Sequence, residues 1–181
     1  MSLVKLNIAR GVTGTLPTSN YVDVGGKILQ VKQATTTTQV EASFSSETSL
    51  GLAVSITPSS SSNKILVFVQ SAGCGTRDTS TYWKMTLRKD TTDILNFPAY
   101  VGINQSSEET YPSGVYLDSP SSTSSISYNC TGTRVSGSAN CYFNHTASSP
   151  NQATSTITVM EVSAWLILVA KMESVLVVNE N

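Results

Sequence analysis

The sequence predicts an all-β protein, an antiparallel, jelly-roll-like β-sandwich with an extended N-terminal arm. Three observations lead to this fold class. Apolar and polar residues alternate along many short segments, which is the period-2 pattern of strands with one buried face. Glycines, prolines and serines separate these segments at regular spacing. In addition, the segment ILVFVQ at 65–70 is almost continuously apolar and rich in β-branched residues, which indicates a central strand buried on both faces.

The clearest pair of strands lies on either side of a serine-rich turn. Residues 52–56 alternate between apolar and small side chains, as expected of a strand with one buried face. Pro58 and the serines at 59–62 interrupt this pattern and supply turn-forming residues before the apolar strand at 65–70. A strand, a turn and a buried strand are enough to predict an all-β core.

The other strands follow the same alternation. In segment 27–33, Leu29 and Val31 lie on one face and polar residues on the other, which predicts a half-buried strand. The glycine-containing residues at 73–75 are expected to end the strand at 65–70, and 132–137 is expected to be a turn region. The same pattern predicts further strands at 40–44, 83–87, 94–97, 115–117, 126–130, 141–143 and 157–162. About ten short strands with regularly spaced turns favour a sandwich or jelly roll.

Length and composition indicate one domain with a hydroxyl-rich surface. A chain of 181 residues is long enough to bury a hydrophobic core, and we place the sandwich domain at 25–164. Charged residues make up 13% of the chain, well under the usual share, and serine and threonine take much of their place. This composition is common in extracellular and virion-exposed β proteins. The net charge of -1, with no basic stripe, argues against a nucleic-acid partner.

No targeting or membrane segment is expected. The first residues, MSLVKLNIARGVTG, lack the apolar core of a signal peptide. No stretch reaches the roughly 20 apolar residues that cross a bilayer as a helix. We therefore expect synthesis in a cytoplasm and no membrane insertion.

Residues 1–24 are expected to form an arm outside the sandwich. Glycines and a proline in the segment GVTGTLPTSN exclude a helix interior. Two interpretations remain open, namely a disordered terminus and an attachment arm that becomes ordered against a partner. The candidate attachment residues are apolar: Leu3, Leu6, Ile8 and Leu16.

Residues 165–181 form an apolar C-terminal extension. The runs WLILVAK and SVLVV are each too short to span a membrane, and exposed they would promote aggregation. We expect Trp165, Leu166 and Leu168 to be buried, either on the sandwich or against a neighbouring subunit. The second arrangement is favoured because these residues lie beyond the last strand of the predicted sandwich.

The stretch at 98–113 is the candidate binding loop. It places tyrosines among amides and carboxylates, and tyrosine combines a rigid ring with a hydroxyl group. The candidate contact residues of this loop are Tyr100, Asn104 and Tyr111. An ordinary long surface loop is the alternative interpretation.

A single histidine limits the catalytic mechanisms. His145 lies in a polar loop without a nucleophile elbow, so a solvated histidine is expected rather than a triad member. Glu108 and Glu109 are adjacent, and neighbouring strand residues point to opposite faces, whereas glycoside hydrolysis needs two carboxyl groups facing one bond. No P-loop or dinucleotide fingerprint occurs. We therefore expect no enzymatic activity and no cofactor.

The cysteines predict neither a metal site nor a disulfide framework. Cys74, Cys130 and Cys141 together with one histidine are too few for a typical zinc site. Cys130 and Cys141 could face each other across a hairpin. Three buried, reduced thiols are the favoured interpretation.

Several segments together resemble a known family. GVTGTLPTSN at 11–20 looks like linker segments of bacteriophage tail fibres. Between residues 11 and 164, the chain resembles a β-sandwich domain of phage tail-fibre and virion structural proteins. The blocks that carry this resemblance are GKILQV, GLAVSITPSSSSNKILVFVQ, YLDSP and STITVMEVSA.

The resemblance implies a homotrimeric virion fibre protein with its N-terminal arm toward the virion and its sandwich projecting outward. The arm would bind other virion proteins, and the target on the host would be a surface polysaccharide or protein. We therefore hypothesise a non-enzymatic tail-fibre or fibre-tip protein that contributes to host attachment. A capsid decoration or head-fibre protein is the alternative. A polysaccharide-degrading tailspike would need paired acids and a longer repetitive chain.

Overall fold

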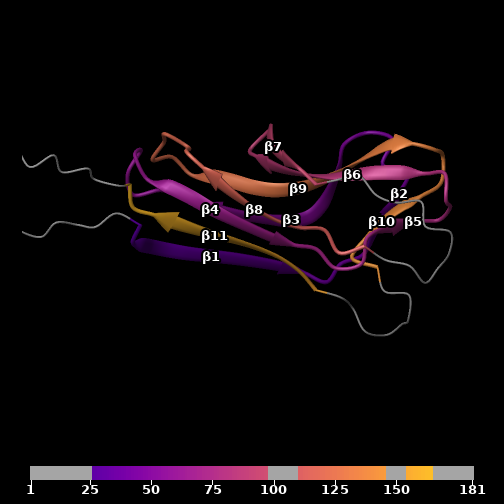
Figure 1. Ribbon diagram of the computed structural model, residues 1–181, viewed down its shortest axis with the longest axis horizontal. Helices are drawn as coiled ribbons and strands as arrows, with labels where there is room; N and C mark the ends of the chain where they lie inside the picture. The colour runs from indigo at the N-terminus through magenta and orange to yellow at the C-terminus, as the bar shows by residue number, and fades with distance from the viewer. Residues whose placement is uncertain (1–25, 98–109, 146–153, 165–181) are drawn as a thin grey trace, which may run out of the picture. The chain divides into compact units, whose positions relative to one another are not determined.

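Eleven β-strands and no helix are found in residues 26–97, 110–145 and 154–164, which are the parts of the chain that a computed structural model describes. They form three antiparallel sheets with the strand orders β1-β11-β4-β8, β3-β9-β6-β7 and β2-β10-β5 (Figure 1). The strands are β1 (Ile28–Thr36), β2 (Val40–Ala42), β3 (Thr48–Ile56), β4 (Lys64–Gln70), β5 (Gly75–Thr76), β6 (Tyr82–Lys89), β7 (Thr92–Asn96), β8 (Ser113–Asp118), β9 (Ile126–Ser136), β10 (Cys141–Phe143) and β11 (Ser155–Val162). The predicted all-β antiparallel fold is confirmed.

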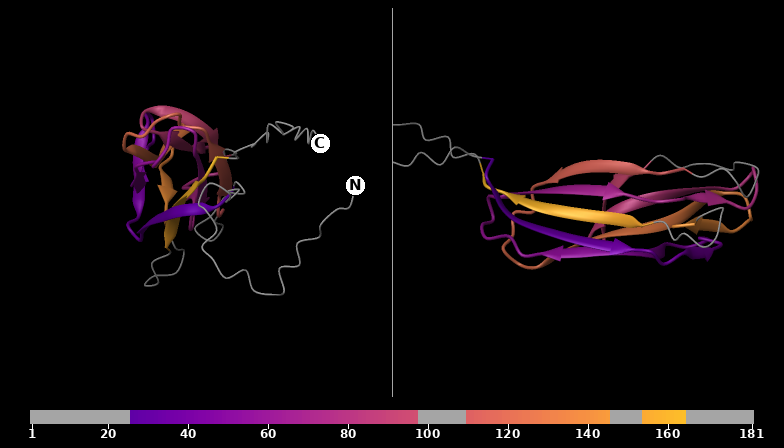
Figure 2. Two further views of the ribbon diagram at one scale, coloured as in Figure 1. Left: turned by 90° about the vertical axis from the view of Figure 1, so that its left-hand side faces the viewer. Right: turned by 90° about the horizontal axis from the view of Figure 1, so that it is seen from below.

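The two four-stranded sheets pack face to face around the core (Figure 2). Alternation along each strand sends every second side chain inward, as the period of a pleated strand requires. In β4, Ile65, Val67 and Val69 are buried, and in β11, Ile157 and Val159 are buried opposite them. The strands of the second sheet supply the other side of the core with residues including Leu50, Leu52, Val54, Ile56, Trp83, Met85, Leu87, Ile126 and Tyr128.

The turn that was predicted at 132–137 is wrong, because β9 continues through Gly132 as far as Ser136. Gly132 does not interrupt the strand but makes room for an aromatic pair. A Cβ atom at this position would lie 2.7 Å from the ring of Phe44 and 3.2 Å from the ring of Trp83. These two rings meet edge to face with centroids 5.0 Å apart. The turn begins one residue after the strand, at Gly137, whose φ of 81° suits a glycine.

The chain enters and leaves the sandwich at the same end. The amide of Gly26 donates to the carbonyl of Ser163 at 3.4 Å, and the amide of Ser163 donates to the carbonyl of Lys27 at 2.9 Å. The amide of Ala164 also donates to Oδ1 of Asn63, in the turn between β3 and β4. The small sheet β2-β10-β5 lies at the opposite end (Figure 1).

Candidate interaction surface

The outer face of the β1-β11-β4-β8 sheet carries one row of apolar side chains and a second row that is half apolar. In register across the four strands lie Val31, Met160, Leu66 and Leu117. The next row consists of Gln33, Thr158, Phe68 and Val115. These positions alternate with the buried residues of the same strands, so they point away from the core. We call this surface the apolar face.

Several side chains of the apolar face are well exposed. The exposed fractions are 51% for Val31, 58% for Val115 and 56% for Leu117, and that of Phe68 is 37%. Lys64 is the charged residue among the described strand positions of this face, and its ammonium group donates to Oγ of Ser119 at 2.7 Å. The face is therefore wide, apolar and almost uncharged.

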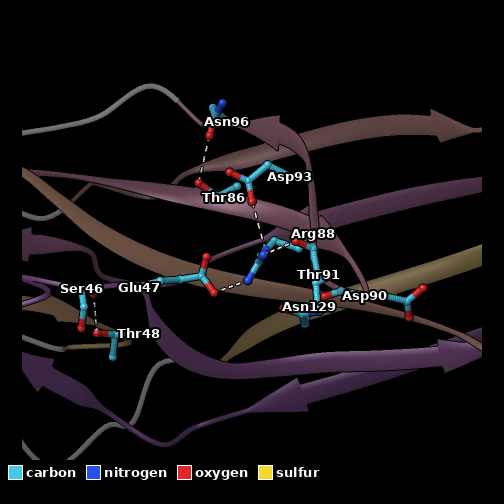
Figure 3. A network of polar contacts seen from close by, with 10 residues as sticks. All are labelled: Ser46, Glu47, Thr48, Thr86, Arg88, Asp90, Thr91, Asp93, Asn96 and Asn129. Atoms are coloured by element: carbon cyan, nitrogen blue, oxygen red, sulfur yellow. Dashed lines mark hydrogen bonds and ion pairs between the residues drawn. The ribbon is translucent and has the colours of Figure 1, made fainter.

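The outer face of the β3-β9-β6-β7 sheet is polar by comparison. Figure 3 shows the guanidinium group of Arg88 between the carboxylates of Glu47 and Asp93, with Nε of Arg88 3.0 Å from Oδ1 of Asp93. Nearby, the hydroxyl of Thr86 donates to Oδ1 of Asn96 at 2.9 Å. A polar outer face is what a solvated antiparallel sheet normally presents. The contrast between the two sheets makes the apolar face the candidate for contact with a partner.

The predicted burial of 65–70 on both faces is wrong for the described part of the chain. The inner residues of β4 are buried as expected, but Leu66 is only half-buried and Phe68 is exposed on the outer face. The pair Leu29 and Val31 likewise lies on the outside, with exposed fractions of 41% and 51%. Strands that are apolar on both faces are typical of sheets covered on both sides.

A hollow lies within the apolar face beside Phe68. It has a volume of about 620 Å³, and its lining includes Phe68 and Val115 together with the polar side chains of Gln33, Gln70 and Thr158. The polar part of this lining is neutral, since it consists of amide and hydroxyl groups. Such a hollow can accept a protruding apolar side chain and hydrogen-bond to polar groups around it.

Of the predicted receptor contacts, the structure describes one. The side chain of Tyr111 is 63% exposed. It follows Thr110, whose amide and carbonyl pair with those of Cys74 at 2.9 Å, and this bridge fixes the start of the segment that leads into β8. Tyr100 and Asn104 lie outside the described residues. So do the candidate attachment residues Leu3, Leu6, Ile8, Leu16, Trp165, Leu166 and Leu168.

Near the small sheet, two charged side chains form an ion pair, and aromatic rings pack beside them. Arg77 donates from Nε and Nη2 to the two carboxylate oxygens of Glu41, at 2.9 and 2.7 Å. The hydrogen bond from Arg77 lowers the pKa of Glu41, and the same bond raises the pKa of Arg77. The guanidinium carbon lies 5.5 Å from the ring centroid of Tyr142, which packs against the ring of His145 at 4.5 Å. His145 is half-buried, so the predicted solvated histidine is wrong.

The sequence did not predict the buried polar bridge that connects the two large sheets. Asp118 is the last residue of β8 and is 5% exposed. Its Oδ2 accepts a hydrogen bond of 2.7 Å from the hydroxyl of Tyr128, which lies in β9 of the opposite sheet. The ammonium group of Lys89 lies 3.2 Å from the same carboxylate. Burial raises the pKa of Tyr128, and the bond to the Asp118 carboxylate raises it further. Because the predicted strand at 115–117 ends before residue 118, no sequence signal pointed to this bridge.

A second buried carboxylate belongs to Glu161 in β11. The side chain has no solvent-exposed surface, and four hydrogen bonds reach it. The donors are Nδ2 of Asn63 at 2.6 Å, Nε2 of Gln30 at 2.6 Å, and both the amide and the hydroxyl of Ser59 at 2.7 Å. Burial alone raises the pKa of Glu161, but these bonds outweigh it and lower the pKa to about 2. The cluster therefore holds a charge in the native state and has a structural role.

The three cysteines are buried thiols that form no disulfide, as the favoured interpretation of the sequence predicted. The alternative interpretation, in which Cys130 and Cys141 form a disulfide, is therefore wrong. Burial raises the pKa of Cys130 to about 12 and that of Cys141 to about 11. Both thiols are therefore protonated and unreactive at neutral pH.

Within 26–97, 110–145 and 154–164, no cluster of three or more histidine, cysteine or acidic side chains is arranged to bind a metal ion. In the same ranges, no helix has the length and apolar character that crossing a membrane demands.

The comparisons with known proteins include a distant structural similarity. No protein-family model matches the chain, and no curated protein matches it. Among solved structures, the chain is similar to part of the structure of infectious bursal disease virus Gx strain, with a TM-score of 0.27 and 10% sequence identity. The alignment covers 75% of this chain and 42% of that chain, so the protein spans less than half of the length of the chain it matches. A similarity at this TM-score carries no argument about function.

Proposed function

We propose that the chain is a non-enzymatic structural protein of a bacteriophage particle, a tail-fibre or fibre-tip component that contributes to host attachment. The observation that carries this proposal is the apolar face, because a large exposed apolar patch marks a surface built for contact with another molecule. The sequence blocks that resemble fibre and virion proteins support the same role. The sandwich that these blocks imply is the observed architecture.

The position of the chain ends supports attachment at one end and contact at the other. Gly26 and Ala164 lie at one end of the sandwich, so the segments before and after it start from the same place. The arm at residues 1–24 would connect there to other virion proteins. The opposite end carries Tyr111, which with Tyr100 and Asn104 would contact a polysaccharide or protein of the host surface.

Labelled-antibody electron microscopy of purified phage tests the location. Label on tail fibres is the expected result. Label on the head would replace the tail assignment with a head-fibre or decoration role. The absence of label from intact and partly disrupted particles would refute a virion role altogether.

Phage adsorption tests the contribution to attachment. Removal of residues 1–24 is expected to prevent incorporation into particles, and Tyr111→Ala is expected to slow adsorption while incorporation stays normal. Thr123→Ala is the matched control, because Thr123 is exposed in the turn between β8 and β9, near the end where the chain enters. Unchanged adsorption of the Tyr111→Ala phage would exclude a receptor contact at this tyrosine.

A further inference from the structure

We infer that the apolar face of the β1-β11-β4-β8 sheet is the surface through which copies of this chain bind one another. The inference concerns contacts between copies, and it holds whether or not the protein is part of a phage fibre. It is argued from the register of the apolar rows, the charge of the face and the position of the chain ends.

The first step is that the apolar face extends across the whole sheet. The row of Val31, Met160, Leu66 and Leu117 contains one apolar residue from each strand. Scattered exposed apolar residues are normal on a monomer, whereas a continuous row over four strands is not. The other sheet of the same sandwich, with its network around Arg88, shows the polar surface that solvent exposure would favour.

The second step is that the charge and the polar groups of the apolar face allow it to bind an identical face on another copy. When two copies meet through the same face, a face that carries several charges of one sign brings like charges close together, which costs binding energy. This face carries Lys64 as its charge, and that ammonium group already donates to Ser119 at 2.7 Å. Its polar residues, such as Gln33 and Thr158, have groups that both donate and accept hydrogen bonds, so they can pair with identical groups.

The third step is that the face contains both protruding side chains and a hollow. Val115 and Leu117 are each more than half exposed. The hollow of about 620 Å³ lies beside Phe68 in the same sheet. An interface between identical surfaces needs such complementary features on one surface, because each copy must supply what the other accepts.

The fourth step fixes the relative direction of the copies. The row that contains Val31 and Met160 lies nearer the end where the chain leaves at Ala164, and the polar row of Gln70 and Ser113 lies nearer the opposite end. In copies that are aligned in the same direction, the apolar segments 165–181 begin at the same end of the assembly, just after Ala164.

The test is the mass of the full chain in solution, measured by light scattering coupled to gel filtration over a range of concentrations. The unmodified protein is expected to be an oligomer. Leu117→Glu places a carboxylate in the apolar row of the apolar face, on the edge strand β8, and is expected to weaken association by about a hundredfold or more. Ser55→Glu adds the same charge to an exposed position on the outer face of the other sheet, and this control is expected to remain an oligomer.

A second measurement remains informative if Leu117→Glu fails to fold. Val115→Cys introduces an exposed thiol on the apolar face, while the three native cysteines are buried. Mild oxidation is expected to link copies of Val115→Cys covalently, at concentrations where Ser55→Cys stays unlinked. A monomeric unmodified protein, an unchanged mass for folded Leu117→Glu, or equal linking of the two cysteine variants would each overturn the inference. Cover by residues 165–181 of the same chain would produce the first of these results.

Discussion

The side-chain amide of Asn63 donates a hydrogen bond of 2.6 Å to Oε1 of Glu161, and this contact joins the turn between β3 and β4 to the last strand of the sandwich. The same Asn63 accepts the amide proton of Ala164 through Oδ1. A single asparagine thus holds both the carboxylate in the core and the point at which the chain leaves the sheet.

Glu161→Gln is expected to destabilise the fold by about 1–3 kcal/mol, because an amide in place of the carboxylate leaves buried donors without acceptors. Urea unfolding followed by tryptophan fluorescence measures the change. Glu47→Gln serves as the control, since Glu47 is 47% exposed and an ion pair at such a site contributes about 0–1 kcal/mol. Equal unfolding midpoints for both variants would show that the Glu161 cluster contributes little.

Acid is expected to destabilise the protein through the same carboxylate. The pKa of Glu161 is about 2 in the folded protein, below its ordinary value of 4.5, so the folded state favours the charged form. The resulting stability is present in full above about pH 4.5 and is lost as the pH falls toward 2. Unfolding free energies measured from pH 6 to pH 2 should decrease in the unmodified protein and decrease less steeply in Glu161→Gln. Parallel pH profiles for the two proteins would contradict this assignment.

Tyr128→Phe is expected to cost about 1–3 kcal/mol, because it removes the hydroxyl donor from the buried carboxylate of Asp118 and leaves Lys89 as its remaining side-chain partner among the described residues. Thermal or urea unfolding detects this loss. Tyr82→Phe provides the comparison, since Tyr82 is 41% exposed and its substitution should change stability by less than about 0.5 kcal/mol. A Tyr128→Phe protein as stable as Tyr82→Phe would mean that the bridge between the sheets is unimportant.

Gly132→Ala is expected to destabilise the protein by about 1–3 kcal/mol through overpacking, since the new methyl group would overlap the rings of Phe44 and Trp83. The near-ultraviolet circular dichroism of Trp83 should change as the ring pair is displaced. Gly51→Ala tests backbone strain instead, because Gly51 has a φ of 68° and open space around it. The dichroism signal of Trp83 should stay the same in that variant, and an unchanged signal in Gly132→Ala would refute the packing argument.

The thiols are expected to resist modification in the folded protein. Cys74, Cys130 and Cys141 are each at most 1% exposed, and burial raises the pKa of Cys130 to about 12. A colorimetric thiol reagent at pH 8 should react slowly with native protein and rapidly with all three cysteines in denaturant. Rapid native reaction of even one equivalent would show that the sandwich opens locally at a cysteine.

The strands were predictable because alternation is a local property. The strand pattern places β3, β4, β6 and β11 correctly, since each has buried residues at every second position. Alternation does not reveal which face meets the core, and β1 illustrates this limit. Gln30 lies on its inner side because its amide donates to Glu161, while Leu29 and Val31 lie outside. Which face of β1 meets the core therefore depends on Glu161, which is far away in the sequence.

The candidate surface was only partly predictable for the same reason. The apolar face is assembled from four strands, and its rows depend on a register that no local pattern encodes. The one sequence signal was the continuous apolar run at 65–70, which implied a cover on both sides. The role of Gly132 was missed because glycine in a sequence suggests a turn, whereas here the ring of Phe44, from a distant segment, occupies the space.

The shared entry and exit point has a mechanical consequence. β1 and β11 are neighbours in one ladder, and their outer ends meet where Gly26 and Ser163 are hydrogen-bonded. A force that pulls the preceding and following segments apart therefore acts on one hydrogen bond at a time, beginning with the bond between Gly26 and Ser163, rather than on the whole ladder together. The sandwich withstands tension only if both segments are fastened to the same support, so that the load never separates these two strands.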